Sequence, residues 1–149
     1  MGIKITGIKE LERRLEREIE RQAEEKLIAF LGRIGWETIT AIRTGEASNW
    51  DDHSTNLRSS IGYLIVRNGE IVDSSGFTAV RKEGEEGARR GRAYAEELAG
   101  QYRKGVALII VAGMEYAAYV EAIDGKQVLA GGELFAKKKV KELVAKYRR

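Results

Sequence analysis

A long helical periodicity at the N-terminal end constrains this chain most. Apolar side chains and one threonine recur there at steps of three and four residues, at Ile8, Leu11, Leu15, Ile19, Ala23, Leu27, Phe30, Ile34, Thr38 and Ala41. These steps place them on one stripe of an α-helix. We expect Thr6 to cap this helix and Gly45 to end it, because glycine readily adopts the left-handed conformation of a helix end.

The length of this helix predicts that part of it extends beyond the domain. A helix from Ile8 to Thr44 would be about 55 Å long, which exceeds the diameter of a small domain. Part of its stripe must therefore meet another surface, most simply a second subunit. Gly32 and Gly35 lie inside the helix. Because glycine weakens a helix, we expect either a kink there or a close crossing with another backbone.

The composition excludes several classes of protein. The chain has 149 residues, a net charge of +3 and no cysteine, so disulfides and thiolate metal sites are absent. Its length suggests one domain, 1–149. The longest apolar run, Val106 to Ala112, is too short to cross a bilayer. We expect no signal peptide, and synthesis in a reducing cytoplasm.

The middle of the chain predicts a β-hairpin. A strand is expected from Leu57 to Val66 and a return strand from Glu70 to about Val80, joined by Asn68-Gly69, which suits a type I′ turn. Gly76 could mark a bulge in the return strand. The first strand alternates, with one face carrying Ile61, Tyr63 and Ile65 and the other carrying Leu64 and Val66.

The next segments are predicted from composition and spacing. Arg81 to Arg92 is charged and rich in glycine, so we expect a mobile excursion or hairpin tip. Ala93 to Lys104 predicts a short helix ended by Gly105, with an apolar side formed by Tyr94, Leu98 and Tyr102. Val106 to Ala112 is apolar and β-branched, which predicts a central strand buried on both faces.

The C-terminal third predicts two further helices. Glu115 to Ile123 should form a short helix, Gln127 to Ala130 a fourth strand, and Leu134 to Arg149 a final helix. The apolar side of the final helix is expected to carry Leu134, Val140, Leu143, Val144 and Tyr147. The predicted fold is α+β: a long helix (1–45), a mainly antiparallel sheet of about four strands with helical insertions (46–131), and a C-terminal helix (132–149).

Three features resemble the neck proteins of long-tailed bacteriophages, which act in tail completion or head–tail joining. These are the long N-terminal helix followed by a polar loop, the segment Thr55 to Ile61 opening a hairpin strand, and the segment Glu115 to Glu121 after an apolar strand, with Phe135 entering the last helix. The resemblance implies a structural virion protein that forms a ring between portal and tail. It further implies neck or tail proteins as partners and no enzymatic activity.

The chain also departs from the family pattern. Ser54-Thr55 stands where the family usually has Thr-Gly, and Ala122 to Gly125 stands where it often has Gly-Thr-Gly. Leu134 replaces a common proline. The fold expectation is unchanged, while tail-completion, tail-terminator and connector roles stay open.

Subunit contacts are expected near the family-like segments. The candidate interface residues are Leu57, Arg58, Tyr116, Tyr119, Val120 and Glu121. Tyrosine is enriched at interfaces. The alternative for Tyr116 and Tyr119 is packing of the short helix onto the sheet, since apolar stripes at helical spacing usually belong to a core. Core burial is likewise the preferred interpretation for Leu57.

Two basic clusters support a second function, a small nucleic-acid-binding protein. The candidate DNA-facing residues are Arg89, Arg90 and Arg92 in one cluster and Lys137, Lys138, Lys139 and Lys141 in the other. Such clusters could neutralise phosphates. Neighbouring glutamates dilute the first, and a basic last turn also suits the helix dipole. A solvated face is therefore the alternative.

Catalysis has little support in the sequence. The single histidine, His53, follows Asp51 and Asp52, but adjacent residues point in different directions and do not form a triad. We expect a solvated loop there. Glycines 84, 87 and 91 lack the following lysine and hydroxyl residue of a phosphate-binding loop. No catalytic residue, metal ligand, cofactor or small-molecule substrate is predicted.

Overall fold

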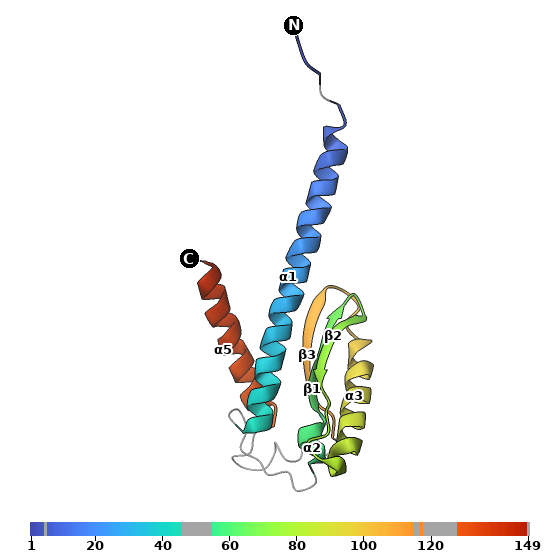
Figure 1. Cartoon of the computed structure of the whole chain (residues 1–149), viewed down its shortest axis with the longest axis vertical. Helices are drawn as coiled ribbons and strands as arrows, with labels where there is room; N and C mark the ends of the chain where they lie inside the picture. Colours follow the sequence, from blue (N-terminus) through green and yellow to red (C-terminus); the bar gives the residue numbers. More distant parts are fainter. Residues whose placement is uncertain (5, 46–54, 115–116, 118–127, 149) are drawn as a thin grey trace.

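The computed structural model describes residues 1–4, 6–45, 55–114, 117 and 128–148. These residues form an α+β fold, as predicted (Figure 1). In chain order the elements are α1 (Ile8–Thr44), α2 (Asn56–Ser59), β1 (Ile61–Arg67), β2 (Glu70–Gly76), a 3-10 turn η1 (Lys82–Gly84), α3 (Glu85–Ala99), β3 (Val106–Ala112) and α5 (Ala130–Tyr147). One face of the sheet packs on α1 and the other on α3, while α5 lies beside the C-terminal part of α1.

The long helix α1 has the predicted bounds. It ends at Gly45, whose φ of 87° is left-handed and whose N–H donates to the Ile42 carbonyl oxygen at 3.3 Å. The predicted cap at Thr6 is wrong. Gly7 occupies the capping position with a φ of 81°, and no side chain bonds to the helix start. Glycine adopts this conformation at little steric cost, so the chain enters the helix without a side-chain cap.

The hairpin confirms both the turn and the alternation. Asn68 and Gly69 have φ values of 51° and 86°, as a type I′ turn requires. Alternate side chains of β1 divide between the two cores: Ile61, Tyr63 and Ile65 on the α1 side, Leu64 and Val66 on the α3 side.

The hairpin differs from prediction at its bulge and at its ends. Ile65 pairs with Asp73 and Val66 with Ile71, so the extra residue is Val72 and not Gly76. The predicted first strand starts too early, because residues 56–59 form the short helix α2. The predicted return strand ends too late, because the left-handed Phe77 (φ 51°) turns the chain away after Gly76.

The segment Arg81 to Arg92 is largely helical, so the predicted excursion or hairpin tip is wrong. It forms η1 and the first half of α3. Its glycines permit close packing: an added Cβ would lie 2.1 Å from Ser59 Oγ at Gly84, 2.1 Å from the Asn56 carbonyl oxygen at Gly87, and 2.3 Å from the Ser60 carbonyl oxygen at Gly91. Here the glycines let η1 and α3 pack closely against α2 and Ser60, which precede β1.

The apolar side predicted for the following helix is confirmed at Leu98, which packs against the core, and is wrong at Tyr94 and Tyr102. The helix ends at Ala99, and its buried face carries Gly87, Gly91, Ala95 and Ala99 at steps of four. Tyr94 and Tyr102 are nearly half exposed. Small residues form the packed ridge because the helix lies too close to the sheet for tyrosine.

The strand β3 has the predicted bounds but a different place. The strand order is β2-β1-β3, and β1 pairs antiparallel with both neighbours, so β1 is central and β3 is an edge. Both faces of β3 still pack: Leu108 and Ile110 lie on the α1 side, and Ile109 and Val111 lie on the α3 side. Two-sided packing explains the continuous apolar run without a central position.

The fourth strand is absent from the described part of the chain. Of the predicted range 127–130, Gln127 lies outside the described residues, Val128 and Leu129 form a bend, and Ala130 begins α5. The Leu129 carbonyl oxygen accepts a hydrogen bond from the Glu133 N–H at 2.8 Å, which closes the first helical turn. The predicted helix from Glu115 to Ile123 lies outside the described residues except for buried Ala117.

Candidate functional site

The N-terminal part of α1 projects beyond the sheet as an isolated helix (Figure 1). Every residue from 8 to 23, which we call the arm, is exposed. The stripe predicted for burial is therefore open to solvent here: Ile8, Leu11, Leu15 and Ile19 are exposed by 48%, 56%, 54% and 66%. Large apolar side chains in a row on an exposed face are typical of an interaction surface.

The C-terminal part of α1 is packed on two sides. Its stripe residues Ile34, Thr38 and Ala41 are fully buried, and Ile39 and Ile42 belong to the core beneath the sheet. Gly132 brings α5 against this part, because an added Cβ there would lie 2.3 Å from Ile42 Cδ1. The apolar stripe of α1 is therefore buried in the core only along the C-terminal half of the helix.

The glycines of α1 allow a close crossing with the sheet. An added Cβ on Gly35 would lie 2.7 Å from Cγ of Tyr63, and one on Gly32 would lie 2.9 Å from Oδ2 of Asp73. The Tyr63 hydroxyl donates to Asp73 at 3.1 Å. Burial, together with the neighbouring Asp73 carboxylate, raises the pKa of Tyr63 to about 12. The crossing is thus made with side chains of β1 and β2.

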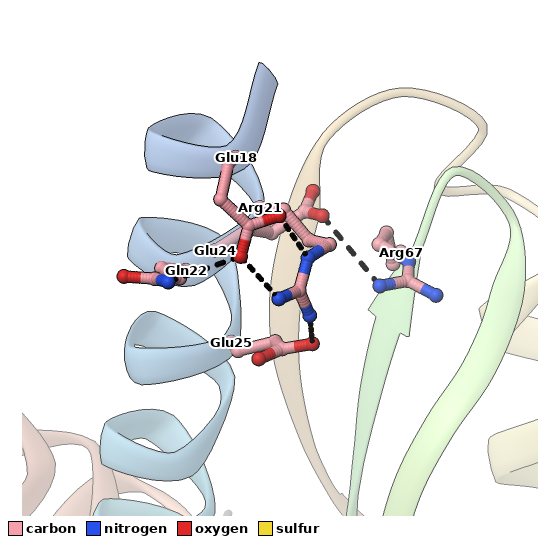
Figure 2. A network of polar contacts seen from close by, with 6 residues as sticks. All are labelled: Glu18, Arg21, Gln22, Glu24, Glu25 and Arg67. Carbon is pink, nitrogen blue, oxygen red and sulfur yellow. Dashed lines mark hydrogen bonds and ion pairs between the residues drawn. The ribbon is translucent and has the colours of Figure 1, made fainter. Parts of the chain in front are cut away.

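A polar network marks where α1 leaves the sheet (Figure 2). Glu24 forms an ion pair with Arg67, at the end of β1, at 3.5 Å. Arg21 bonds to both Glu18 and Glu25 at 2.6 Å. Hydrogen bonds from Arg21, and secondarily from Gln22, lower the pKa of Glu18 to about 2. These contacts are exposed, so they orient side chains and add little stability.

An apolar groove lies between α1, β3 and α5. Its volume is about 670 Å³, and its floor is formed by Ile34, Leu108, Ile110, Ala136 and Val140. Its rim carries Glu133, Lys137 and Lys141. A second hollow shares Val140 and Lys141 and continues along α5 to Val144 and Arg148. Together they form one surface along α5, which we call the groove.

The structure describes only two of the predicted interface residues. Leu57 is 1% exposed and belongs to the core, which is the interpretation the sequence favoured. Arg58 is half-buried and donates to the Arg43 carbonyl oxygen. The other four candidates, Tyr116, Tyr119, Val120 and Glu121, lie outside the described residues.

The two basic clusters do not form one patch. Arg89, Arg90 and Arg92 belong to α3, whereas the lysine cluster belongs to α5, and these helices lie on opposite sides of the sheet (Figure 1). Several of the charges are also engaged within the chain. The contacts are Arg89 and Arg90 with Glu86, Arg92 over the Phe77 ring, Lys137 with Glu133, and Lys139 with Glu37 and the Phe135 ring. Lys138 and Lys141 are exposed.

Other kinds of site find little support in the described part of the chain. Its residues contain no group of three or more metal-ligating side chains, and Asp51, Asp52 and His53 lie outside it. No described helix is long and apolar enough to cross a membrane. Comparisons with protein-family models, curated proteins and solved structures found no match. The arm and the groove are two apolar surfaces suited to binding another protein.

Proposed function

We propose that this protein is a structural subunit of a bacteriophage neck, where copies assemble into a ring that joins head to tail. The single observation that carries the proposal is the arm, a helix exposed on all sides with an apolar stripe along it. The motif resemblance to neck proteins supports the same interpretation. The subunit would be made in the bacterial host cytoplasm and would act in the virion through contacts with other proteins, without a catalytic site or cofactor.

The free energies of burial and association favour a ring over an isolated pair of subunits. Full burial of one Leu or Ile side chain contributes roughly 1.5–3 kcal/mol. Ile8, Leu11, Leu15 and Ile19 are each about half exposed, so burying what remains would contribute roughly 3–6 kcal/mol in total. Association costs roughly 4–15 kcal/mol. One arm contact alone would therefore give a weak pair, whereas a closed ring gives each subunit two contacts.

The test is assembly of the purified protein, alone and with a purified portal or tail component. Mass photometry and electron microscopy should detect oligomers whose population rises with concentration, and a further mass increase with the neck partner. Changing Leu11, Leu15 and Ile19 to Gln should abolish assembly while preserving the helix, because Gln is a good helix former.

A matched control changes three exposed apolar residues elsewhere, Ile71, Tyr94 and Tyr102, to Gln. This control should assemble normally. The proposal is overturned if the wild type stays monomeric with and without the neck partner. It is also overturned if the protein binds duplex DNA tightly at physiological salt, loses that binding when Lys137, Lys138, Lys139 and Lys141 become Gln, and shows no loss of assembly when Leu11, Leu15 and Ile19 become Gln. That result would establish the nucleic-acid-binding function instead.

A further inference from the structure

We propose that the arm of one copy lies in the groove of the next copy, so that subunits join head to tail. This inference rests on the proposed self-assembly and names the two surfaces that make it. The arm offers an apolar stripe of Ile8, Leu11, Leu15 and Ile19. The groove offers an apolar floor that includes Leu108, Ile110 and Val140. An amphipathic helix seated in an apolar groove is a common mode of recognition between proteins.

The chain cannot fill its own groove with its own arm. The groove is lined by Ile34, which belongs to the same unbroken helix as the arm. Leu15 and Ile34 are separated along this helix by about 28 Å, at 1.5 Å per residue. The arm therefore points away from the groove of its own subunit and can reach only the groove of a second molecule.

Charge complementarity selects this partner. Glu12, Glu16 and Glu20 follow one another at steps of four, and at about 100° per residue they lie along one edge of the arm's stripe. All three are exposed and have no ion-pair partner among the described residues. A row of unpaired carboxylates beside an apolar stripe fits an apolar surface with a basic rim.

The groove has such a rim. Lys137, Lys141 and Arg148 lie along its α5 side. Lys137 contacts Glu133, whereas Lys141 and Arg148 have no ion-pair partner among the described residues. The lengths also agree: the arm spans about 24 Å and the α5 segment 130–148 spans about 28 Å, at 1.5 Å per residue.

The charge pattern disfavours an antiparallel pair of arms. An antiparallel arm pair would bring the two glutamate edges together, and such like-charge contacts are unfavourable. Arm and groove are instead two different surfaces of one subunit. Each copy donates one arm and accepts another, and this type of contact closes into a ring when the rotation between copies is suitable.

Cysteine cross-linking tests the contact directly, because the chain contains no cysteine. Two full-length variants, Leu15→Cys and Val140→Cys, are purified separately, mixed and oxidised mildly, so any 15–140 disulfide must join two molecules. Mass spectrometry should find this disulfide in excess over 15–15. In the matched control, Leu15→Cys is mixed with Tyr94→Cys. Residue 94 lies on α3, away from the groove, so little 15–94 disulfide should form. A dominant 15–15 product, or equal yields with the control, would overturn the proposal.

Charge exchange provides an independent test by mass photometry. Changing Glu12, Glu16 and Glu20 to Lys should weaken assembly by roughly tenfold or more, as should changing Lys137, Lys141 and Arg148 to Glu. A 1:1 mixture of the two variants should regain assembly. The matched control reverses three other exposed glutamates, Glu83, Glu96 and Glu97, and should assemble as the wild type does.

The outcomes separate the two proposals. If the wild type assembles but neither reversal weakens it, or the mixture does not recover, the arm–groove contact is overturned while the ring stands. If the wild type is monomeric at all concentrations, with and without a neck partner, both are overturned. Circular dichroism of each variant shows whether its helices are intact, so a folding defect would be recognised.

Discussion

Residues 28–42 of α1 pack against the sheet and α5, whereas residues 8–23 of the same helix are exposed on every side. The two parts share one apolar periodicity, but they differ in detail. The packed part contains Gly32 and Gly35, which allow close approach to the sheet. The arm contains no glycine and carries rows of charged residues. A stripe thus indicates a helix face suited to burial, and the small residues indicate which part is buried within the subunit.

Truncation of one apolar residue in each part should produce the largest difference. Ile39→Ala removes a side chain that is 1% exposed, and we expect a loss of about 2–5 kcal/mol in the free energy of unfolding. Leu15→Ala should change it by less than about 0.5 kcal/mol in the dilute monomer, because Leu15 is exposed there. Urea unfolding followed by circular dichroism measures both. Similar losses would mean that the arm packs within its own subunit.

Exchanging glycine and alanine should be destabilising in both parts of α1, as Gly→Ala in the packed part and as Ala→Gly in the arm. In a free helix, Gly→Ala is favourable by about 1 kcal/mol. At Gly35 the added Cβ would lie 2.7 Å from the Tyr63 ring, so we expect Gly35→Ala to cost about 1–3 kcal/mol. Ala23→Gly in the arm should cost at most about 1 kcal/mol, through propensity alone. Thermal unfolding shows whether each variant is less stable than the wild type. A stabilised Gly35→Ala variant would refute the close crossing.

The crossing at Tyr63 should also make the free energy of unfolding depend on pH in the alkaline range. The pKa of Tyr63 is raised to about 12 in the fold from an ordinary value of 10.0. Between these values the unfolded chain has lost the tyrosine proton and the folded chain still holds it. Stability must therefore fall as the pH rises through this window. Unfolding free energies of wild type and Tyr63→Phe should diverge there, and parallel pH profiles would exclude the effect.

The smallest effect is expected in the arm's polar network. The pKa of Glu18 is about 2 because Arg21, and then Gln22, donate hydrogen bonds to its carboxylate. Arg21→Ala should raise this pKa toward 4.5, which an NMR titration would detect. The free energy of unfolding should barely change, because exposed ion pairs contribute little. A clear loss of stability would show that the network anchors the arm.

Local signals predicted the bounds of α1 and the turn and alternation of the hairpin. The steps of three and four from Ile8 to Ala41 and the terminal Gly45 act within one helix. Asn68-Gly69 and the alternation from Ile61 to Val66 act within one hairpin. These signals depend on neighbours in sequence, so a single sequence suffices to interpret them. The projecting arm followed from the same periodicity, because a helix of this length exceeds the domain that it joins.

Tertiary contacts decided what such signals could not. Gly84, Gly87 and Gly91 resemble the glycines of a mobile segment until the backbone of residues 56–60 is placed against them. Two-sided packing let β3 lie at an edge although its composition indicates a central strand. The groove combines residues from α1, β3 and α5 that are distant in sequence. A glycine that confers flexibility and one that permits contact are identical in sequence, because the difference lies in the chain packed against it.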